Sequence, residues 1–168
     1  TPVVFGKRAE LRRTDRVNQF ALGSVRFGFH RDSNWRLICP HATGRLALSL
    51  EVLAREAWLA AGQGDRVHGF MAGGDAALIR SIESFEDFPE YGARQLMESG
   101  FGEGDLLVAI TEGGETPFVI GACLKAAEMA REDPWFLFCN PPDTLKRLAK
   151  RSQTVLEHPR VRPFCLRT

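Results

Sequence analysis

Short apolar runs alternate with longer segments of helical periodicity from Trp35 onward. The clearest case starts with the apolar run Asp105 to Ile110 (DLLVAI), which is broken by Gly113-Gly114. Thr116 and Pro117, a typical cap residue and a typical first residue of a helix, then open a helical pattern over Val119 to Arg131. A strand, a glycine turn and a capped helix form a βα unit, so the alternation predicts an α/β fold with a parallel sheet.

The same pattern predicts the other elements of the sheet. Three further strands are expected at Trp35 to Cys39, Val67 to Met71 and Trp135 to Cys139. Helices are expected over Thr43 to Ala61, Asp75 to Ile82, Phe88 to Ser99 and Pro142 to Arg151. Val155 and the segment Phe164 to Leu166 are expected to add further strand. These elements place one α/β unit at residues 35–168.

The first 34 residues lack this alternation and are assigned to a separate N-terminal lead-in. Arg16 to Phe29 is predicted to be a helix in spite of Gly23 and Gly28. Because the chain starts at Thr1 without a Met and stops just after an apolar run, we expect a larger parent protein, with the α/β domain truncated at its C-terminus.

Bulk properties exclude several classes of protein. A chain of 168 residues fits one domain, and its net charge of +1 gives no general attraction to nucleic acid. The longest apolar runs fall far short of the roughly 20 residues of a membrane span, and no signal-peptide layout is present. The four cysteines lie far apart without a Cys-x-x-Cys pair, so neither zinc nor a disulfide framework is indicated. We therefore expect a cytoplasmic protein without metal or cofactor.

Charge is unevenly distributed along the chain. Residues 1–36 hold 8 Lys and Arg against 3 Asp and Glu, and residues 144–168 hold 7 against 1. The middle of the chain is correspondingly acidic. Two interpretations stay open: solvated faces that pack against the acidic middle, or a basic end that contributes to an anion site or a subunit contact.

Two predicted βα loops have the chemistry of a phosphate site, namely Pro40 to Arg45 and Thr111 to Pro117. Parallel strands bring such loops to one edge, where helix N-termini attract phosphate. Neither loop matches a Walker or Gly-x-Gly-x-x-Gly motif, which argues against nucleoside triphosphates and dinucleotides. The segment Glu83 to Asp87 adds three carboxylates that accept hydrogen bonds from sugar hydroxyls or move a proton. His41 is a further candidate ligand or acid/base group.

Four segments, in the same order, resemble the N-acetylmuramic acid 6-phosphate etherases and the glucokinase regulatory proteins, which carry sugar isomerase (SIS) domains. Thr43-Gly44-Arg45-Leu46 is similar to the end of a Gly-Thr-Ser-Gly-Arg-Leu loop, and Ala72-Gly73-Gly74 with Glu83, Glu86 and Asp87 to an Ala-Gly-Gly…Glu-x-x-Glu-Asp stretch. Thr116 to Gly121 is similar to Thr-Pro-Tyr-Val-Ile-Gly, and Cys139-Asn140-Pro141 to Cys-Asn-Pro. The resemblance covers roughly residues 35–142 and implies a three-layer α/β/α, doubly wound parallel sheet of the SIS type.

The resemblance also implies a site for a phosphorylated sugar or amino sugar. Its ligand-binding residues would be Thr43, Gly44, Arg45, Glu83, Glu86, Thr111, Gly113, Gly114 and Thr116. Thr111 takes the place of a ligand-contacting serine of the regulatory proteins. Glu83 and Glu86 take the place of residues that hold sugar hydroxyls there.

The departures from the family bear on catalysis. Leu53 stands where the etherases have one of two catalytic carboxylates, while Glu86 corresponds to the other. Glu51 and Glu56 are near Leu53, but a helix turns about 100° per residue, so they project elsewhere. In the second loop the etherase Ser is Gly113 and the etherase Arg is Glu115. In the first loop Gly-x-Gly-Thr-Ser is replaced by residues 39–43, which keep one hydroxyl and lose two glycines.

Three functions stay open at this point. The first is a non-catalytic sugar-phosphate sensor or regulator similar to glucokinase regulatory protein, with a protein partner such as a sugar kinase. The second is a carbon–oxygen lyase of the etherase type that releases D-lactate, using Glu86 with a substitute carboxylate or imidazole such as Glu51 or His41. The third is an assembly domain with a degraded pocket. In each case the resemblance implies a homodimer or a second SIS copy.

Overall fold

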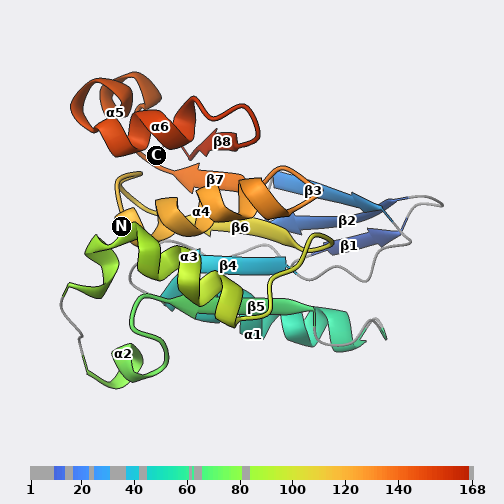
Figure 1. Cartoon of the computed structure of the whole chain (residues 1–168). Helices are drawn as coiled ribbons and strands as arrows, with labels where there is room; N and C mark the ends of the chain where they lie inside the picture. The colour runs from blue at the N-terminus through green and yellow to red at the C-terminus, as the bar shows by residue number, and fades with distance from the viewer. Residues whose placement is uncertain are drawn as a thin grey trace, which may run out of the picture.

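A computed structural model describes residues 10–13, 17–22, 25–30, 37–41, 45–60, 62, 66–80 and 84–166. A parallel sheet lies at its centre. The five strands of this sheet are β4 (Leu37–His41), β5 (Val67–Met71), β6 (Leu106–Ile110), β7 (Trp135–Phe138) and β8 (Arg162–Cys165). Their order is β5-β4-β6-β7-β8, and every neighbouring pair is parallel (Figure 1). The predicted α/β fold is confirmed.

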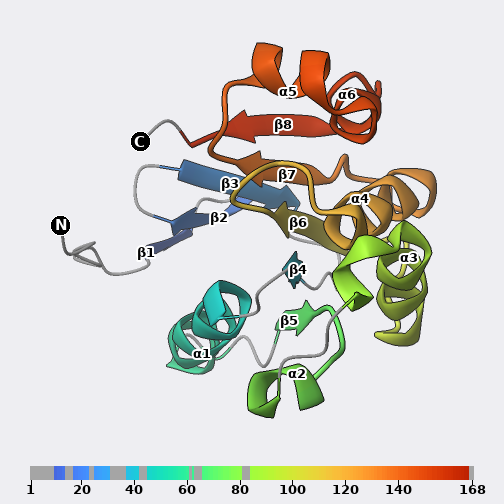
Figure 2. The ribbon, with the colours of Figure 1, turned by 90° about the vertical axis from the view of Figure 1, so that its left-hand side faces the viewer.

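Helices flank this sheet on both faces. They are α1 (Arg45–Ala60), α2 (Ala76–Ile79), α3 (Pro89–Glu98), α4 (Pro117–Met129), α5 (Pro142–Leu148) and α6 (Lys150–Leu156), with a 3-10 turn, η1 (Phe85–Asp87), before α3. Figure 2 shows α1 on one side of the sheet and α3 and α4 on the other. The strand order places the reversal of winding between β4 and β6, which is the doubly wound pattern.

The N-terminal helix prediction is wrong. A three-stranded antiparallel sheet occupies this part of the chain: β1 (Glu10–Arg13), β2 (Val17–Leu22) and β3 (Val25–His30). In β3 the large apolar residues Val25, Phe27 and Phe29 alternate with Arg26 and Gly28. This period of two, together with β-branched and aromatic residues, favours strand over helix.

Three other boundaries differ from the prediction. β4 extends to His41, so Pro40 is a buried residue of a central strand rather than part of a loop. The ladder from β4 to β6 pairs Leu37, Ile38 and His41 and passes over the two residues between them; proline has no N–H to donate to a ladder. Val155 lies in α6 and not in a strand, and the predicted helix Pro142 to Arg151 is divided at Ala149, whose φ of −130° and ψ of 105° are extended.

Helices α3 and α4 touch through their backbones. A methyl group at Gly92 of α3 would overlap the carbonyl oxygen of Phe118, and one at Gly121 of α4 would overlap that of Pro89. Only glycine allows this approach, and it buries Leu96 and Phe118 completely. The contact also holds η1 against α4. The turn η1, which bears Glu86 and Asp87, therefore lies beside α4, the helix that follows the loop Thr111 to Thr116.

The central strand β6 is buried on both faces of the sheet. Leu107 and Ala109 of β6 belong to the core under α4, whereas Leu106, Val108 and Ile110 point to the opposite face, because side chains alternate along a strand. All three are at most 5% exposed. Among the described helices only α1 lies on that side, and Figure 2 places the small β1–β3 sheet there as well.

In the described part of the chain, no helix combines the length and apolar character needed to cross a membrane.

Candidate functional site

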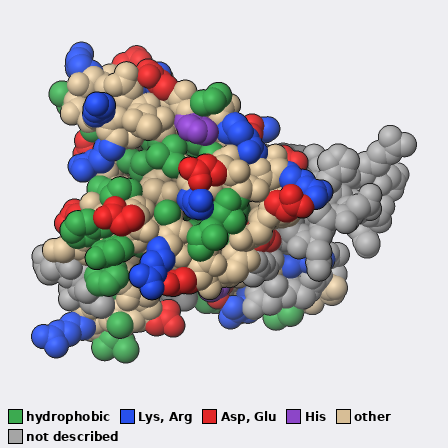
Figure 3. Space-filling model, in the orientation of Figure 1, with side chains coloured by type: hydrophobic (Ala, Val, Ile, Leu, Met, Phe, Trp, Pro, Cys, Tyr) green, Lys and Arg blue, Asp and Glu red, His purple; other side chains and the backbone are tan. Residues whose placement is uncertain are grey.

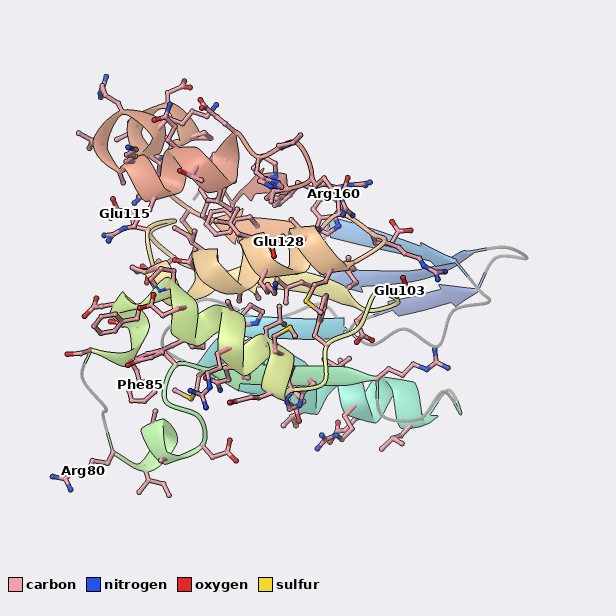
Figure 4. The ribbon with its side chains drawn as sticks, viewed as in Figure 1. Arg80, Phe85, Glu103, Glu115, Glu128 and Arg160 are labelled. Carbon is pink, nitrogen blue, oxygen red and sulfur yellow. The ribbon has the colours of Figure 1, made fainter. Side chains whose placement is uncertain are left out.

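The loop Thr111 to Thr116 connects β6 to α4 at the carboxyl edge of the sheet, where Glu115 projects (Figure 4). Thr111 Oγ1 and Thr116 Oγ1 are 3.0 Å apart and share a hydrogen bond, and the N–H of Gly114 donates to Thr111 Oγ1 at 3.3 Å. Thr116 therefore does not cap α4 with its side chain, contrary to the prediction. The first N–H groups of α4 thus lack a side-chain cap, which leaves a positive helix end suited to an anion.

Two side chains from beyond β7 in the chain hold this loop by hydrogen bonds to its carbonyl groups. Asn140 Nδ2 donates to the Gly113 carbonyl oxygen at 3.1 Å, and the fully buried Ser152 Oγ donates to that of Gly114 at 2.7 Å. In a trans peptide the N–H points opposite to the C=O. The N–H of Glu115 consequently points away from Ser152 and α6. Ser152 fixes the orientation of this loop, and sequence reasoning missed it, because a single serine in a helix has no recognisable pattern.

Replacing Ser152 with alanine is expected to lower the free energy of unfolding by about 1–3 kcal/mol, since the buried Gly114 carbonyl would lose its donor. Chemical denaturation of the two proteins measures this difference. Ser152→Thr keeps a hydroxyl and is expected to retain part of the bond. A Ser152→Ala variant as stable as the parent would contradict the assignment of this hydrogen bond.

The two adjacent glycines of the loop have different requirements. Gly114 has φ of +81°, and a methyl group there would lie 2.6 Å from Leu145 Cδ1 and 3.3 Å from Phe138 Cβ. It must be glycine. Gly113 has no left-handed φ, and the nearest atom to its added methyl group is Asn140 Nδ2 at 3.9 Å. A larger side chain therefore fits at Gly113 but not at Gly114.

Negative charge surrounds the loop. Glu112 and Glu115 are both exposed, and burial, the Glu112 charge and Cys165 together raise the pKa of the Cys139 thiol. Cys139 also ties the loop to β7, because its N–H donates to the Glu112 carbonyl oxygen at 2.9 Å. The side chains thus oppose a phosphate dianion, while the backbone N–H groups of the loop and of α4 attract it.

A second group of candidates lies on η1. Glu86 is exposed there, Ser84 before it has a left-handed φ of 69°, and Glu83 lies outside the described residues. Phe85 of η1 and Glu115 of the loop project at the same edge of the molecule (Figure 4). The structure thus brings the predicted carboxylate segment and the predicted phosphate loop to the same edge.

The first predicted loop is shorter than expected. β4 ends at His41 and α1 begins at Arg45, so the connection is residues 42–44 alone. Thr43 and Gly44 lie outside the described residues, and only the backbone is described at His41 and Arg45. Their roles as ligands stay predictions.

The carboxylate proposed as a replacement on α1 is already engaged. Glu51 Oε2 accepts from the N–H of Gly69 at 2.7 Å, and its Oε1 accepts from Arg55 at 2.6 Å, with the side chain only 14% exposed. Glu51 thus ties α1 to β5. Leu53, at the position where the resemblance implies a catalytic glutamate, is 57% exposed. Glu56 is exposed as well.

Within the described ranges, no three His, Cys, Asp or Glu side chains converge as they would at a metal centre.

Comparison with known proteins identifies the domain. The family model described as the glucokinase regulatory protein N-terminal SIS domain matches residues 39–128, which is more than half of the chain. The chain belongs to this family. The matched part of this SIS domain contains every predicted ligand residue from Thr43 to Thr116, and it ends before Asn140 and Ser152.

Relatives of this SIS domain include N-acetylmuramic acid 6-phosphate etherases. That of Synechococcus elongatus is 46% identical over 79 residues, 47% of this chain and 25% of the relative. That of Aliivibrio fischeri is 37% identical over 97 residues, which are 58% of this chain and 32% of the relative. That of Mesorhizobium japonicum is 41% identical over 85 residues, which are 51% of this chain and 27% of the relative. The chain thus spans about a quarter to a third of the length of the curated relatives it matches.

Proposed function

We propose that this SIS domain binds a phosphorylated sugar or amino sugar and does not catalyse ether cleavage, similar to a glucokinase regulatory protein. The phosphate would lie against the N–H groups at the start of α4, at the loop that Asn140 and Ser152 hold in place. The sugar hydroxyls would donate to the Glu86 carboxylate, which is exposed on the adjoining η1 turn.

The proposal that the domain does not catalyse ether cleavage is supported by the residues of α1. Elimination of a lactate ether needs one group to remove a proton and another to protonate the leaving oxygen. Leu53 has no proton to exchange, and Glu51 is held by Gly69 and Arg55. Of the two carboxylates that the resemblance implies, Glu86 alone is left.

An etherase-like lyase is the second candidate. It is supported by the 37–46% identity to curated etherases and by Glu86. For Glu51 to act as the second carboxylate, it would have to leave both the Gly69 N–H and the Arg55 guanidinium, which leaves a backbone donor of β5 without its partner. His41 is the other residue that this candidate would require.

The regulatory function carries further expectations. It implies a protein partner such as a sugar kinase, whose contact with this domain would depend on the bound sugar. It also implies a cytoplasmic location, and a homodimer or a second SIS copy. Co-purification with and without sugar phosphate addresses the partner.

The test combines a binding assay with an activity assay. We expect N-acetylglucosamine 6-phosphate, fructose 6-phosphate or fructose 1-phosphate to stabilise the protein, by about 2.7 kcal/mol at 100 times its dissociation constant. We expect no D-lactate from N-acetylmuramic acid 6-phosphate. Glu86→Gln should reduce the stabilisation, because a carboxylate acceptor is lost.

Two outcomes would contradict this proposal. D-lactate release that disappears in Glu86→Gln would establish the lyase instead. If none of these three sugar phosphates and N-acetylmuramic acid 6-phosphate stabilises the protein, the assembly domain is favoured. Leu53→Glu is the informative gain-of-function variant, because its exposed position accepts a carboxylate without repacking the core.

A further inference from the structure

Three aromatic side chains form a continuous exposed patch on η1 and the start of α3. The ring of Tyr91 lies 5.1 Å from that of Phe85 and 5.1 Å from that of Phe88, measured between centroids. Each of the three residues is nevertheless 40–42% exposed. Exposed apolar side chains that stand singly are ordinary, but a contiguous group marks an interaction site.

These rings lie outside the buried core. Helix α3 packs against α4 through Gly92 and Leu96, which are buried, whereas Phe85 on η1, Phe88 at the start of α3 and Tyr91 in its first turn are all partly exposed. They contact one another, and none of them belongs to the core cluster. The patch therefore requires an explanation outside the stability of the domain.

Carboxylates surround the patch. Glu86, Asp87 and Glu90 are all exposed, and the cation that follows them, Arg94, is paired with Glu98. Hydrophobic and acidic side chains adjoin at the left-hand edge of Figure 3, over η1 and the start of α3. These carboxylates disfavour phosphate, as Glu112 and Glu115 do at the loop Thr111 to Thr116. Carboxylates do accept hydrogen bonds from hydroxyl groups.

An aromatic surface with carboxylate acceptors beside it fits a sugar ring. The C–H face of a pyranose is apolar and packs on an aromatic face, while its hydroxyls at the rim donate to carboxylates. The patch also adjoins elements of the candidate site, because Glu86 follows Phe85 in η1 and η1 contacts α4, the helix that begins after the Thr111 to Thr116 loop. The row of three contacting rings extends further than one pyranose ring, so it offers room for a sugar ring beyond the first.

We propose that Phe85, Phe88 and Tyr91 form a subsite for a second sugar ring. This inference rests on the proposed function: the phosphate of the first sugar would lie at the Thr111 to Thr116 loop, and its hydroxyls at Glu86. The ligand class is then a phosphorylated disaccharide of amino sugars rather than a monosaccharide phosphate alone. The side chains of the patch set this specificity.

The test compares two probes, N-acetylglucosamine 6-phosphate and N,N′-diacetylchitobiose 6′-phosphate. Phe88 is the N-cap residue of α3, so Phe88→Ser removes a ring while it introduces a preferred cap residue. We expect this variant to bind the disaccharide phosphate about tenfold more weakly, the loss of one stacked ring, and the monosaccharide phosphate unchanged. Leu148→Ser, which removes an apolar side chain that is 72% exposed on α5, is the matched control and should change neither affinity.

Tyr91 supplies a direct second readout, because it is the only tyrosine of the chain. Protein labelled with 3-fluorotyrosine gives one fluorine resonance, located in the patch. We expect this resonance to shift with the disaccharide phosphate and to stay nearly unmoved with the monosaccharide phosphate or with inorganic phosphate.

Each contrary result has a separate meaning. If the disaccharide phosphate binds but leaves the Tyr91 resonance unmoved, or if Phe88→Ser weakens both probes equally, the subsite is overturned while the proposed function stands. If the Leu148→Ser control loses affinity to the same extent as Phe88→Ser, the subsite is also overturned. If neither probe binds the parent protein, the proposed function fails and the subsite fails with it.

Discussion

Gly92→Ala is expected to destabilise the domain by at least about 3 kcal/mol, and Gly121→Ala by a similar amount. Helix propensity alone predicts the opposite sign, because alanine stabilises a helix interior by about 1 kcal/mol relative to glycine. Contact between the backbones of α3 and α4 outweighs this gain. The added methyl groups would overlap the carbonyl oxygens of Phe118 and Pro89, and backbone atoms cannot move aside as a flexible side chain can.

Chemical denaturation of each variant measures this effect, and failure to obtain folded protein is its extreme form. Gly104→Ala is the control, since no atom lies within 4 Å of its added methyl group and its φ is not left-handed. It is expected to be neutral or slightly stabilising. If Gly92→Ala proved as stable as Gly104→Ala, the close crossing of α3 and α4 would be wrong, and with it the position of η1 beside α4.

Gly113→Ser combined with Glu115→Arg is expected to tighten sugar-phosphate binding at least about tenfold. These changes introduce the residues that the resemblance to the etherases implies at the two positions. The open space and ordinary φ at Gly113 accept a serine, and Glu115 is exposed, so the backbone of the loop is retained. The substitution replaces a repelling carboxylate with a guanidinium that binds phosphate in a bidentate manner.

Isothermal titration with N-acetylglucosamine 6-phosphate at low and high salt measures this gain, which should shrink as salt screens the charge. Glu132→Arg makes the same change of net charge at an exposed residue after the other end of α4, and it should leave affinity nearly unchanged. An equal gain in both variants would indicate a general charge effect. No gain in the double variant would mean that phosphate does not bind at this loop.

The sequence predicts local patterns well and misses what depends on distant contacts. The β6–loop–α4 unit was predictable, because a buried apolar run, two glycines and Thr-Pro follow one another within a few residues. The β1–β3 sheet was missed, since the alternation in β3 is short and β2 does not share it. The boundary at His41 was missed because proline is unusual in a central strand.

The candidate site was predicted only in outline. Thr111, Gly114 and Thr116 could be chosen from the sequence, but the hydroxyl pair and the left-handed φ of Gly114 appear only in the structure. Ser152 lies 38 positions beyond Gly114, and no local pattern connects the two. Glu51 was considered as an acid/base group because the sequence predicts the strand that holds Gly69, but not that the N–H of Gly69 donates to Glu51.

The second face of the sheet sets a limit on how this protein can be shortened. Leu106, Val108 and Ile110 are buried on the side where α1 is the only described helix and where the β1–β3 sheet also lies. A boundary at residue 34 separates the two folding patterns in the sequence, and Figure 2 places the β1–β3 sheet on the same side as this apolar face. Apolar faces of parallel sheets drive aggregation when they meet water. We therefore expect a chain cut at residue 34 to aggregate more readily than the full chain.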